Sequence, residues 1–166
     1  QLGKDDILVI EAFTGLMQTE LCPSKESKFK IYISALTQLN IDEHNRIPTT
    51  DMRLLRRMVR DSLFRSHDAT HNKSKCKGEG RRGKYIFPFS EEADILFNTT
   101  LIYELAVFKK YAYPLLERIQ PDTAEYTVAS KLKSMLSIVE PIDDEPIPNN
   151  SIIREFIGHS VFGDLL

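Results

Sequence analysis

The amino-acid sequence predicts an α/β protein in which short apolar strands alternate with longer amphipathic helices. The chain has 166 residues, of which 42% are hydrophobic and 28% charged, as expected for one globular domain. Three short apolar segments are interspersed with segments of helical periodicity, and this alternation favours a parallel sheet flanked by helices. We therefore expect residues 1–166 to form a single α/β domain with a parallel sheet flanked by helices.

The expected strands are short runs of apolar or β-branched residues. Residues 7–10 (ILVI) lie between acidic residues, a pattern typical of a buried parallel strand. Residues 29–36 (FKIYISAL) are rich in aromatic and β-branched residues and predict a second strand. The apolar segment 95–97 predicts a third.

Four segments have the features of helices. Thr49-Thr50-Asp51 offers N-caps for a helix that runs to about Arg65. Its apolar side is expected to contain Leu54, Leu55, Met58, Val59 and Ser62. Residues 101–119 have apolar side chains at helical spacing, and residues 123–139 form a further helix that Pro141 ends. A last helical turn or two, 151–157, should end at Gly158.

The charge is distributed unevenly along the chain. The formal net charge is −2, but residues 46–84 contain 12 Lys/Arg and four Asp/Glu, a balance of +8. The rest of the chain has 10 Lys/Arg and 20 Asp/Glu, a balance of −10. A basic block in an acidic protein indicates an anionic partner, although a solvated helix face followed by a loop would have the same composition.

The sequence predicts a cytoplasmic protein that does not cross a membrane. No apolar run approaches the ~20 residues of a membrane span, and no secretion leader is apparent. The two cysteines, Cys22 and Cys76, are far apart and are interpreted as reduced thiols. Because the chain starts at Gln1, a fragment or a processed terminus is expected.

Two motif-like patterns are poor matches to the sites that they suggest. Residues 78–84 fit G-x-x-x-x-G-K, but Tyr85 follows where a phosphate-binding loop has Ser or Thr, and no strand precedes it. His67, His71 and Cys76 give three zinc ligands without the tight paired spacing of structural zinc sites. Surface histidines in a polar loop explain the second pattern better.

Two other features favour phosphoryl-transfer chemistry. Glu11 directly follows an apolar segment, and a carboxylate at the carboxyl end of a parallel strand can hold Mg²⁺ through water. The expected helix at 49–65 has an arginine-rich face, and converging guanidinium groups can bind a polyphosphate. Its arginines are Arg53, Arg56, Arg57, Arg60 and Arg65. Ion pairs with Asp51 and Asp61, or binding of a nucleic-acid backbone, would use the same side chains.

Three segments resemble the uridine kinase/phosphoribulokinase family of P-loop kinases, specifically a bacterial-type uridine kinase-like branch. They are KIYISALTQLNIDEHNRIPTTDMRLLRRMVRD (30–61), RRGKYIFPFSEEADILFNTTLIYELAVFKKYAYPLL (81–116) and IPNNSIIREFIG (147–158), which together cover about half of the chain. The arginine-rich helix resembles the lid helix of that family. Residues 9–11 resemble its segment of apolar strand and Glu, although Ala12 stands where the family has Gly.

The resemblance implies the C-terminal part of a kinase whose phosphate-binding loop lies upstream of Gln1. It implies ATP and Mg²⁺ as cofactors, a nucleoside such as uridine as acceptor, and a lid at about 51–84. Glu11 would support Mg²⁺, and Arg56, Arg57, Arg60 and Arg65 would bind the nucleotide. Arg60 and Arg65 would also act in catalysis. The chain alone is then expected to be inactive.

Two alternatives stay open. The basic block at 46–84 could bind RNA or another phosphate backbone, which makes a nucleic-acid partner possible. A pseudokinase could also keep the fold for a regulatory role, because Arg65-Ser66-His67 stands where the family has Arg-Gly-Arg. The sequence does not indicate an oligomeric state.

Overall fold

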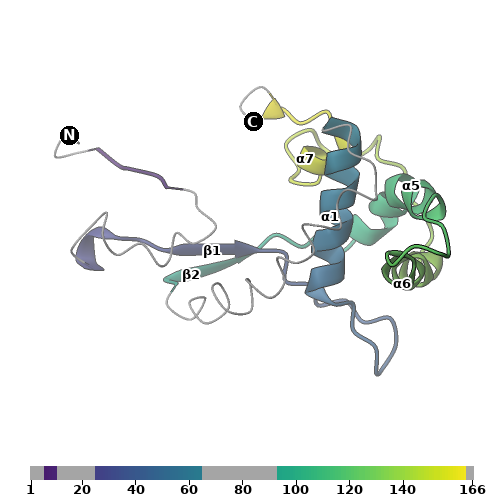
Figure 1. Cartoon of the computed structure of the whole chain (residues 1–166). Helices are drawn as coiled ribbons and strands as arrows, with labels where there is room; N and C mark the ends of the chain where they lie inside the picture. Colours follow the sequence, from purple (N-terminus) through teal and green to yellow (C-terminus); the bar gives the residue numbers. More distant parts are fainter. Residues whose placement is uncertain (1–5, 11–24, 65–92, 164–166) are drawn as a thin grey trace. The chain divides into compact units, whose positions relative to one another are not determined.

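The computed structural model describes residues 6–10, 25–64 and 93–163, which contain two strands and four α-helices (Figure 1). In chain order they are β1 (Ile31–Ser34), α1 (Thr49–Phe64), β2 (Ile95–Asn98), α5 (Glu104–Glu117), α6 (Tyr126–Ser137) and α7 (Arg154–Ile157), with a short 3₁₀ turn at Lys25–Ser27. The chain forms two compact units, one of residues 1–33 and 78–97 and one of residues 34–77 and 98–166. The single domain expected from the length stays a prediction.

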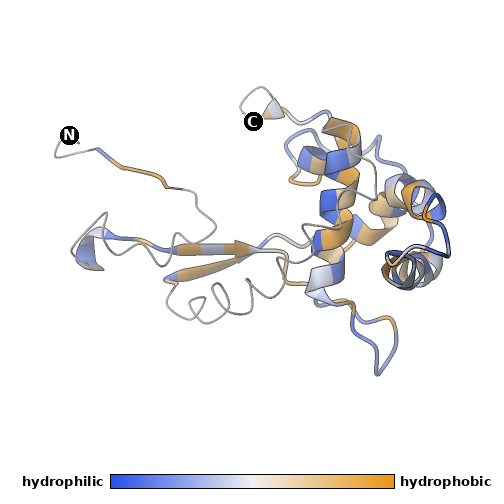
Figure 2. Ribbon diagram, in the orientation of Figure 1, coloured by the Kyte–Doolittle hydropathy of each residue, from blue (hydrophilic) through white to orange (hydrophobic). Residues whose placement is uncertain are grey.

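β1 and β2 pair as parallel strands. The carbonyl of Lys30 accepts a hydrogen bond from the amide of Ile95 at 3.1 Å, and the carbonyl of Ser34 accepts one from Thr99 at 2.9 Å, so both strands advance in the same direction. The mixed α/β class and the strands expected near 29–36 and 95–97 are confirmed. Figure 2 shows that both strands consist mostly of apolar residues.

The expected strand at residues 7–10 is wrong. This segment has neither helical nor strand structure, and the side chains of Ile7 and Val9 are almost fully exposed. An apolar run predicts a tendency to be buried, but a parallel strand also needs a neighbouring strand that completes its hydrogen-bond ladder. In the described part of the chain, the ladder contains β1 and β2 alone.

The hydrophobic core belongs to the second unit, where α5 packs against both α1 and α6, and α7 packs against α1 (Figure 1). Each helix contributes apolar side chains that are fully or almost fully buried, among them Val59, Phe108, Leu132 and Phe156. The rings of Phe108 and Phe156 meet edge to face at 6.0 Å between centroids. The core therefore joins α1 to all the later helices, directly or through α5.

The expected helices are confirmed with shifted ends. α5 begins at Glu104 because residues 101–103 form a turn, and α7 ends at Gly158, whose φ of 94° is a conformation that glycine adopts readily. α1 buries Met52, Leu55, Met58 and Val59 in the core. The lid expected at about 51–84 stays a prediction; because a lid that opens and closes needs few such contacts, this packing favours a place for α1 in the body of the second unit.

No helix in the described residues has the length and apolar character needed to cross a membrane.

Candidate functional site

Three arginines form a stripe along α1, which we call the arginine stripe: Arg53, Arg57 and Arg60. Residues three and four apart lie on the same side of an α-helix, so these guanidinium groups emerge from one face over two turns. The core residues Met52, Leu55 and Val59 occupy the neighbouring face. The amphipathic pattern that buries one side of α1 thus leaves the arginine stripe at the edge of the buried face.

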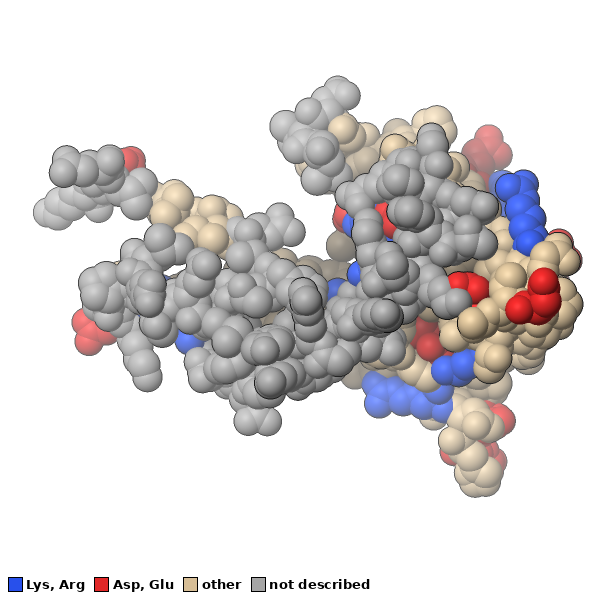
Figure 3. All heavy atoms as spheres, in the orientation of Figure 1, with Lys and Arg blue, Asp and Glu red and all other residues tan. Residues whose placement is uncertain are grey.

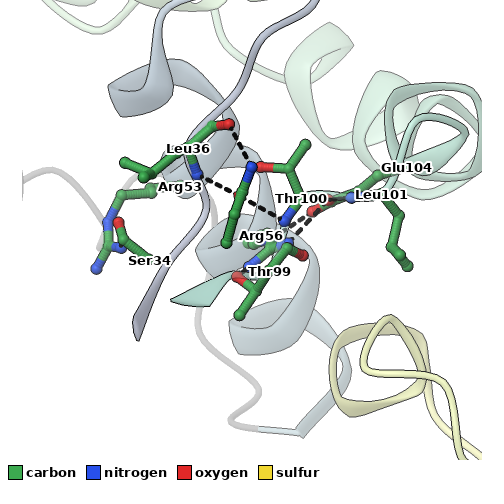
Figure 4. Close-up of polar contacts among 9 residues, drawn as sticks. Ser34, Leu36, Arg53, Arg56, Thr99, Thr100, Leu101 and Glu104 are labelled. Carbon is green, nitrogen blue, oxygen red and sulfur yellow. Dashed lines mark hydrogen bonds and ion pairs between the residues drawn. The ribbon is translucent and has the colours of Figure 1, made fainter. Parts of the chain in front are cut away.

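The first arginine of the stripe contacts the carboxyl end of a strand. Arg53 Nη1 donates a hydrogen bond of 3.1 Å to the hydroxyl of Ser34, the last residue of β1 (Figure 4). Ser34 is 4% exposed. In open α/β sheets, ligands bind beyond the carboxyl ends of parallel strands. The contact therefore joins the arginine stripe to Ser34, the residue that ends β1 and belongs to the same compact unit as α1.

Within the arginine stripe, Arg57 and Arg60 have guanidinium groups that can contact a ligand. Both side chains are partly buried, and within the described residues Arg57 makes no hydrogen bond or ion pair. Arg60 Nε lies 3.5 Å from the carboxylate of the buried residue Asp61, and its side chain is 31% exposed. Two guanidinium groups one turn apart can bind neighbouring oxygens of an anion.

Arg56, which the resemblance assigns to the nucleotide, has its guanidinium group engaged within the protein (Figure 4). It forms a bidentate ion pair with Glu104, in which Nη2 lies 2.8 Å from Oε2. Nη1 donates to the hydroxyl of Thr99 at 2.9 Å, and Nη2 donates to its carbonyl at 2.6 Å. Arg56 is 8% exposed and Glu104 1%. The nucleotide contact predicted for Arg56 stays a prediction, and the geometry favours a structural role.

The residues that meet the arginines were missed by sequence reasoning. Ser34, Thr99 and Glu104 come from a strand end, a loop and a helix that are distant in sequence from α1. The amide of Leu101 donates to Glu104 Oε2 at 3.3 Å, but Leu101 is not a capping residue, so no capping-box motif in the sequence indicated Glu104. The pairing of Glu104 with Arg56 across 48 residues has no local signature.

Several predicted site residues lie outside the residues that the structure describes. These are Glu11, Arg65, the G-x-x-x-x-G-K pattern at 78–84 and the zinc-like set of His67, His71 and Cys76, with Cys22. Most of the loop half of the expected lid and seven of the 12 cations of the basic block also lie there. Among the described residues, no group of three or more His, Cys, Asp or Glu side chains could hold a metal ion.

Apart from the arginine stripe, a polar depression of about 480 Å³ lies between α5 and the segments that flank α7. Two acids pair with its cations: Lys110 Nζ donates to Asp144 Oδ1 at 2.7 Å and lies 3.6 Å from Asp143 Oδ1, and Arg154 Nη1 lies 3.6 Å from Asp144 Oδ2. Hydrogen bonds from Lys110 and Tyr111 lower the pKa of Asp144 to about 2. Because Asp143, Asp144 and Glu145 line the depression together with Lys110 and Arg154, its acids balance its cations, and the arginine stripe is the better candidate for an anion.

Comparisons with protein-family models, curated proteins and solved structures found no match. The chemistry of the site therefore has to be argued from its residues. On the face drawn in Figure 3, basic side chains of the described residues form small separate groups with acidic side chains between them.

Proposed function

We propose that this chain is the C-terminal part of a uridine kinase-like P-loop kinase and takes part in ATP-dependent phosphoryl transfer to a nucleoside. The observation that carries the proposal is the arginine stripe, fastened by Arg53 to Ser34 at the carboxyl end of β1. Guanidinium groups at that edge suit the phosphates of a nucleotide, because Arg forms planar bidentate contacts with phosphate oxygens. The resemblance to the kinase family supplies the reaction.

In this proposal Arg57 and Arg60 bind the polyphosphate, and Arg60 stabilises the charge on the phosphoryl group in transfer. Such an arginine contributes more in the transition state than in the ground state, because negative charge spreads over the transferring oxygens. The guanidinium groups fit the phosphates of ATP. The expected Mg²⁺ ligand, Glu11, lies outside the described residues, so no step is assigned to the ion.

The exposure of β1 and β2 supports the proposal that these two strands belong to a larger parallel sheet. Side chains on both faces of β1 and β2 are exposed, among them Ile33 on one face and Leu96 on the other. Parallel strands in α/β proteins are normally covered on both faces, and two strands alone are marginal in stability. A P-loop kinase would supply further strands and covering helices.

Binding of Mg–ATP to this chain at low ionic strength tests the site. We expect weak binding that Arg57→Ala reduces about tenfold, the loss of one charge-assisted contact, with an unchanged melting temperature. Arg118→Ala is the matched control, because this exposed arginine follows α5 at the end remote from Glu104, roughly 20 Å along the helix. Equal affinities of the two variants would contradict the proposal, and preferential binding of RNA would favour the nucleic-acid alternative.

Turnover of the full-length protein tests the reaction. Removal of an arginine that neutralises the transferring phosphoryl group typically costs about 10³–10⁵ in rate. We expect Arg60→Ala and Arg65→Ala each to lower phosphorylation of uridine by at least about 10², with normal melting. Near wild-type turnover in both variants would remove the catalytic assignment. If the unmodified protein phosphorylates no nucleoside, the pseudokinase alternative replaces this proposal.

A further inference from the structure

The buried guanidinium group of Arg56 joins four segments of the second unit. It belongs to α1, donates twice to Thr99 just after β2, pairs with Glu104 at the start of α5, and lies 5.1 Å from the ring centroid of Phe156 on α7. The last contact has the geometry of a cation–π interaction. The Arg56 side chain thus connects α1 to the residue that follows β2, to α5 and to α7.

A continuous series of hydrogen bonds starts and ends on α1. Arg53 donates to the hydroxyl of Ser34, and the carbonyl of Ser34 accepts from the amide of Thr99 at 2.9 Å. Thr99 in turn accepts from Arg56 through its hydroxyl and its carbonyl. Two points on α1, three residues apart, are therefore tied to the carboxyl ends of both strands (Figure 4).

Two fixed points within one turn determine the rotation of a helix about its axis. Successive residues of an α-helix are 100° apart, so the direction of Arg56 also sets the directions of Arg57 and Arg60. The planar fork of an arginine paired bidentately restricts this rotation more than a single flexible contact would.

From this geometry we infer that Arg56 and Glu104 are a positioning pair: they hold α1 at the rotation that places Arg53 against Ser34 and sets the directions of Arg57 and Arg60, without contacting the ligand themselves. The inference rests on the proposed function of the stripe. It gives the buried pair a role in anion affinity, whereas a purely structural pair would affect folding alone.

The test removes the pair without leaving a buried charge. Replacing a buried ion pair by apolar residues of similar size is often neutral for stability, whereas removing one partner is strongly destabilising. The double variant Arg56→Met/Glu104→Leu is therefore expected to melt near the unmodified chain. Its affinity for inorganic triphosphate, measured by calorimetry, is expected to fall at least about tenfold. Arg56→Lys, which keeps the charge but loses the fork, should lie between the two.

A milder variant covers the case in which the double variant does not fold. Thr99→Val removes only the hydroxyl that accepts from Arg56 Nη1 and leaves the ion pair in place. We expect it to fold and to bind triphosphate about threefold more weakly. Full affinity in a folded Thr99→Val variant, or in the folded double variant, would overturn the positioning role.

The same titrations separate this inference from the proposed function. If Arg57→Ala weakens binding while the folded double variant binds normally, the positioning role is wrong and the arginine stripe stands. If the unmodified chain does not bind triphosphate, or Arg57→Ala binds as well as Arg118→Ala, the proposed function fails first.

Discussion

Gly158 ends α7 with a backbone conformation that other residues avoid. Its φ is 94° and its ψ 175°, and an added Cβ would meet no atom within 4 Å. The cost of Gly158→Ala therefore comes from the backbone alone, and we expect a loss of about 1–3 kcal/mol in the free energy of unfolding. Gly163→Ala, which is equally uncrowded and does not need a positive φ, should change it by less than about 0.5 kcal/mol. Urea unfolding of both variants measures the difference, and equal effects would contradict the assignment.

The ionised carboxylate of Asp144 makes the free energy of unfolding depend on pH in the acidic range. The Lys110 hydrogen bond is the main cause that lowers its pKa to about 2, below the value of an unfolded chain. The stabilisation is therefore complete above about pH 4 and is lost as the pH falls towards about 2. We expect Asp144→Asn to lower the free energy of unfolding by about 1–2 kcal/mol at pH 7, after allowance for solvent screening, and by about half as much at pH 3.

Asp143→Asn is the control for this effect. Asp143 lies 3.6 Å from Lys110, but its side chain is 86% exposed, so its ion pair should contribute little. A loss at pH 7 equal to that of Asp144→Asn, or a loss in Asp144→Asn that does not shrink at pH 3, would contradict the role of Asp144.

At the scale of elements, periodicity predicts a helix and its buried face, but it does not say which partner covers that face. Of the apolar side predicted for α1, Leu55, Met58 and Val59 are buried, whereas Leu54 and Ser62 are only partly buried, and the buried Met52 was not predicted. The structural role of Arg56 was missed, because an arginine among other arginines is ordinarily solvated, and its acceptors lie 43 and 48 residues away. Long-range pairing also explains the error at residues 7–10, where composition indicates a strand without the neighbour that a strand requires.

The amide exchange of α1 tests its place in the fold. Because Met52, Leu55 and Val59 are almost completely buried, we expect the amides of residues 55–62 to be protected as strongly as those in the interior of α5. The exposed residues 7–10 provide the fast reference within the same chain. Exchange of α1 close to that reference, in the absence of nucleotide, would restore the mobile-lid interpretation.

For the molecule as a whole, the notable feature is the apolar face of β1 and β2, whose side chains are exposed in the part of the chain that the structure describes. The ladder places Ile31 beside Ile95 and Ile33 beside Phe97, so these four side chains share one face, and each is about half exposed or more. Contiguous apolar surface of this kind is usually covered by another part of the protein or by a partner. If a partner or a further strand covers this face in the proposed kinase, the chain on its own should associate through it.

We therefore expect the isolated chain to form oligomers at micromolar concentration, and Ile33→Thr/Phe97→Thr to shift it towards the monomer. Threonine keeps the β-branched preference for strands while it removes apolar area, so the pairing of β1 and β2 should persist. Melting of the helical unit should not change, because neither side chain belongs to its core. Ile102→Thr is the control, since Ile102 is 82% exposed but lies in the turn before α5. Light scattering after size-exclusion chromatography gives the masses. A monomeric unmodified chain, or an equal effect of Ile102→Thr, would show that the sheet face does not drive association.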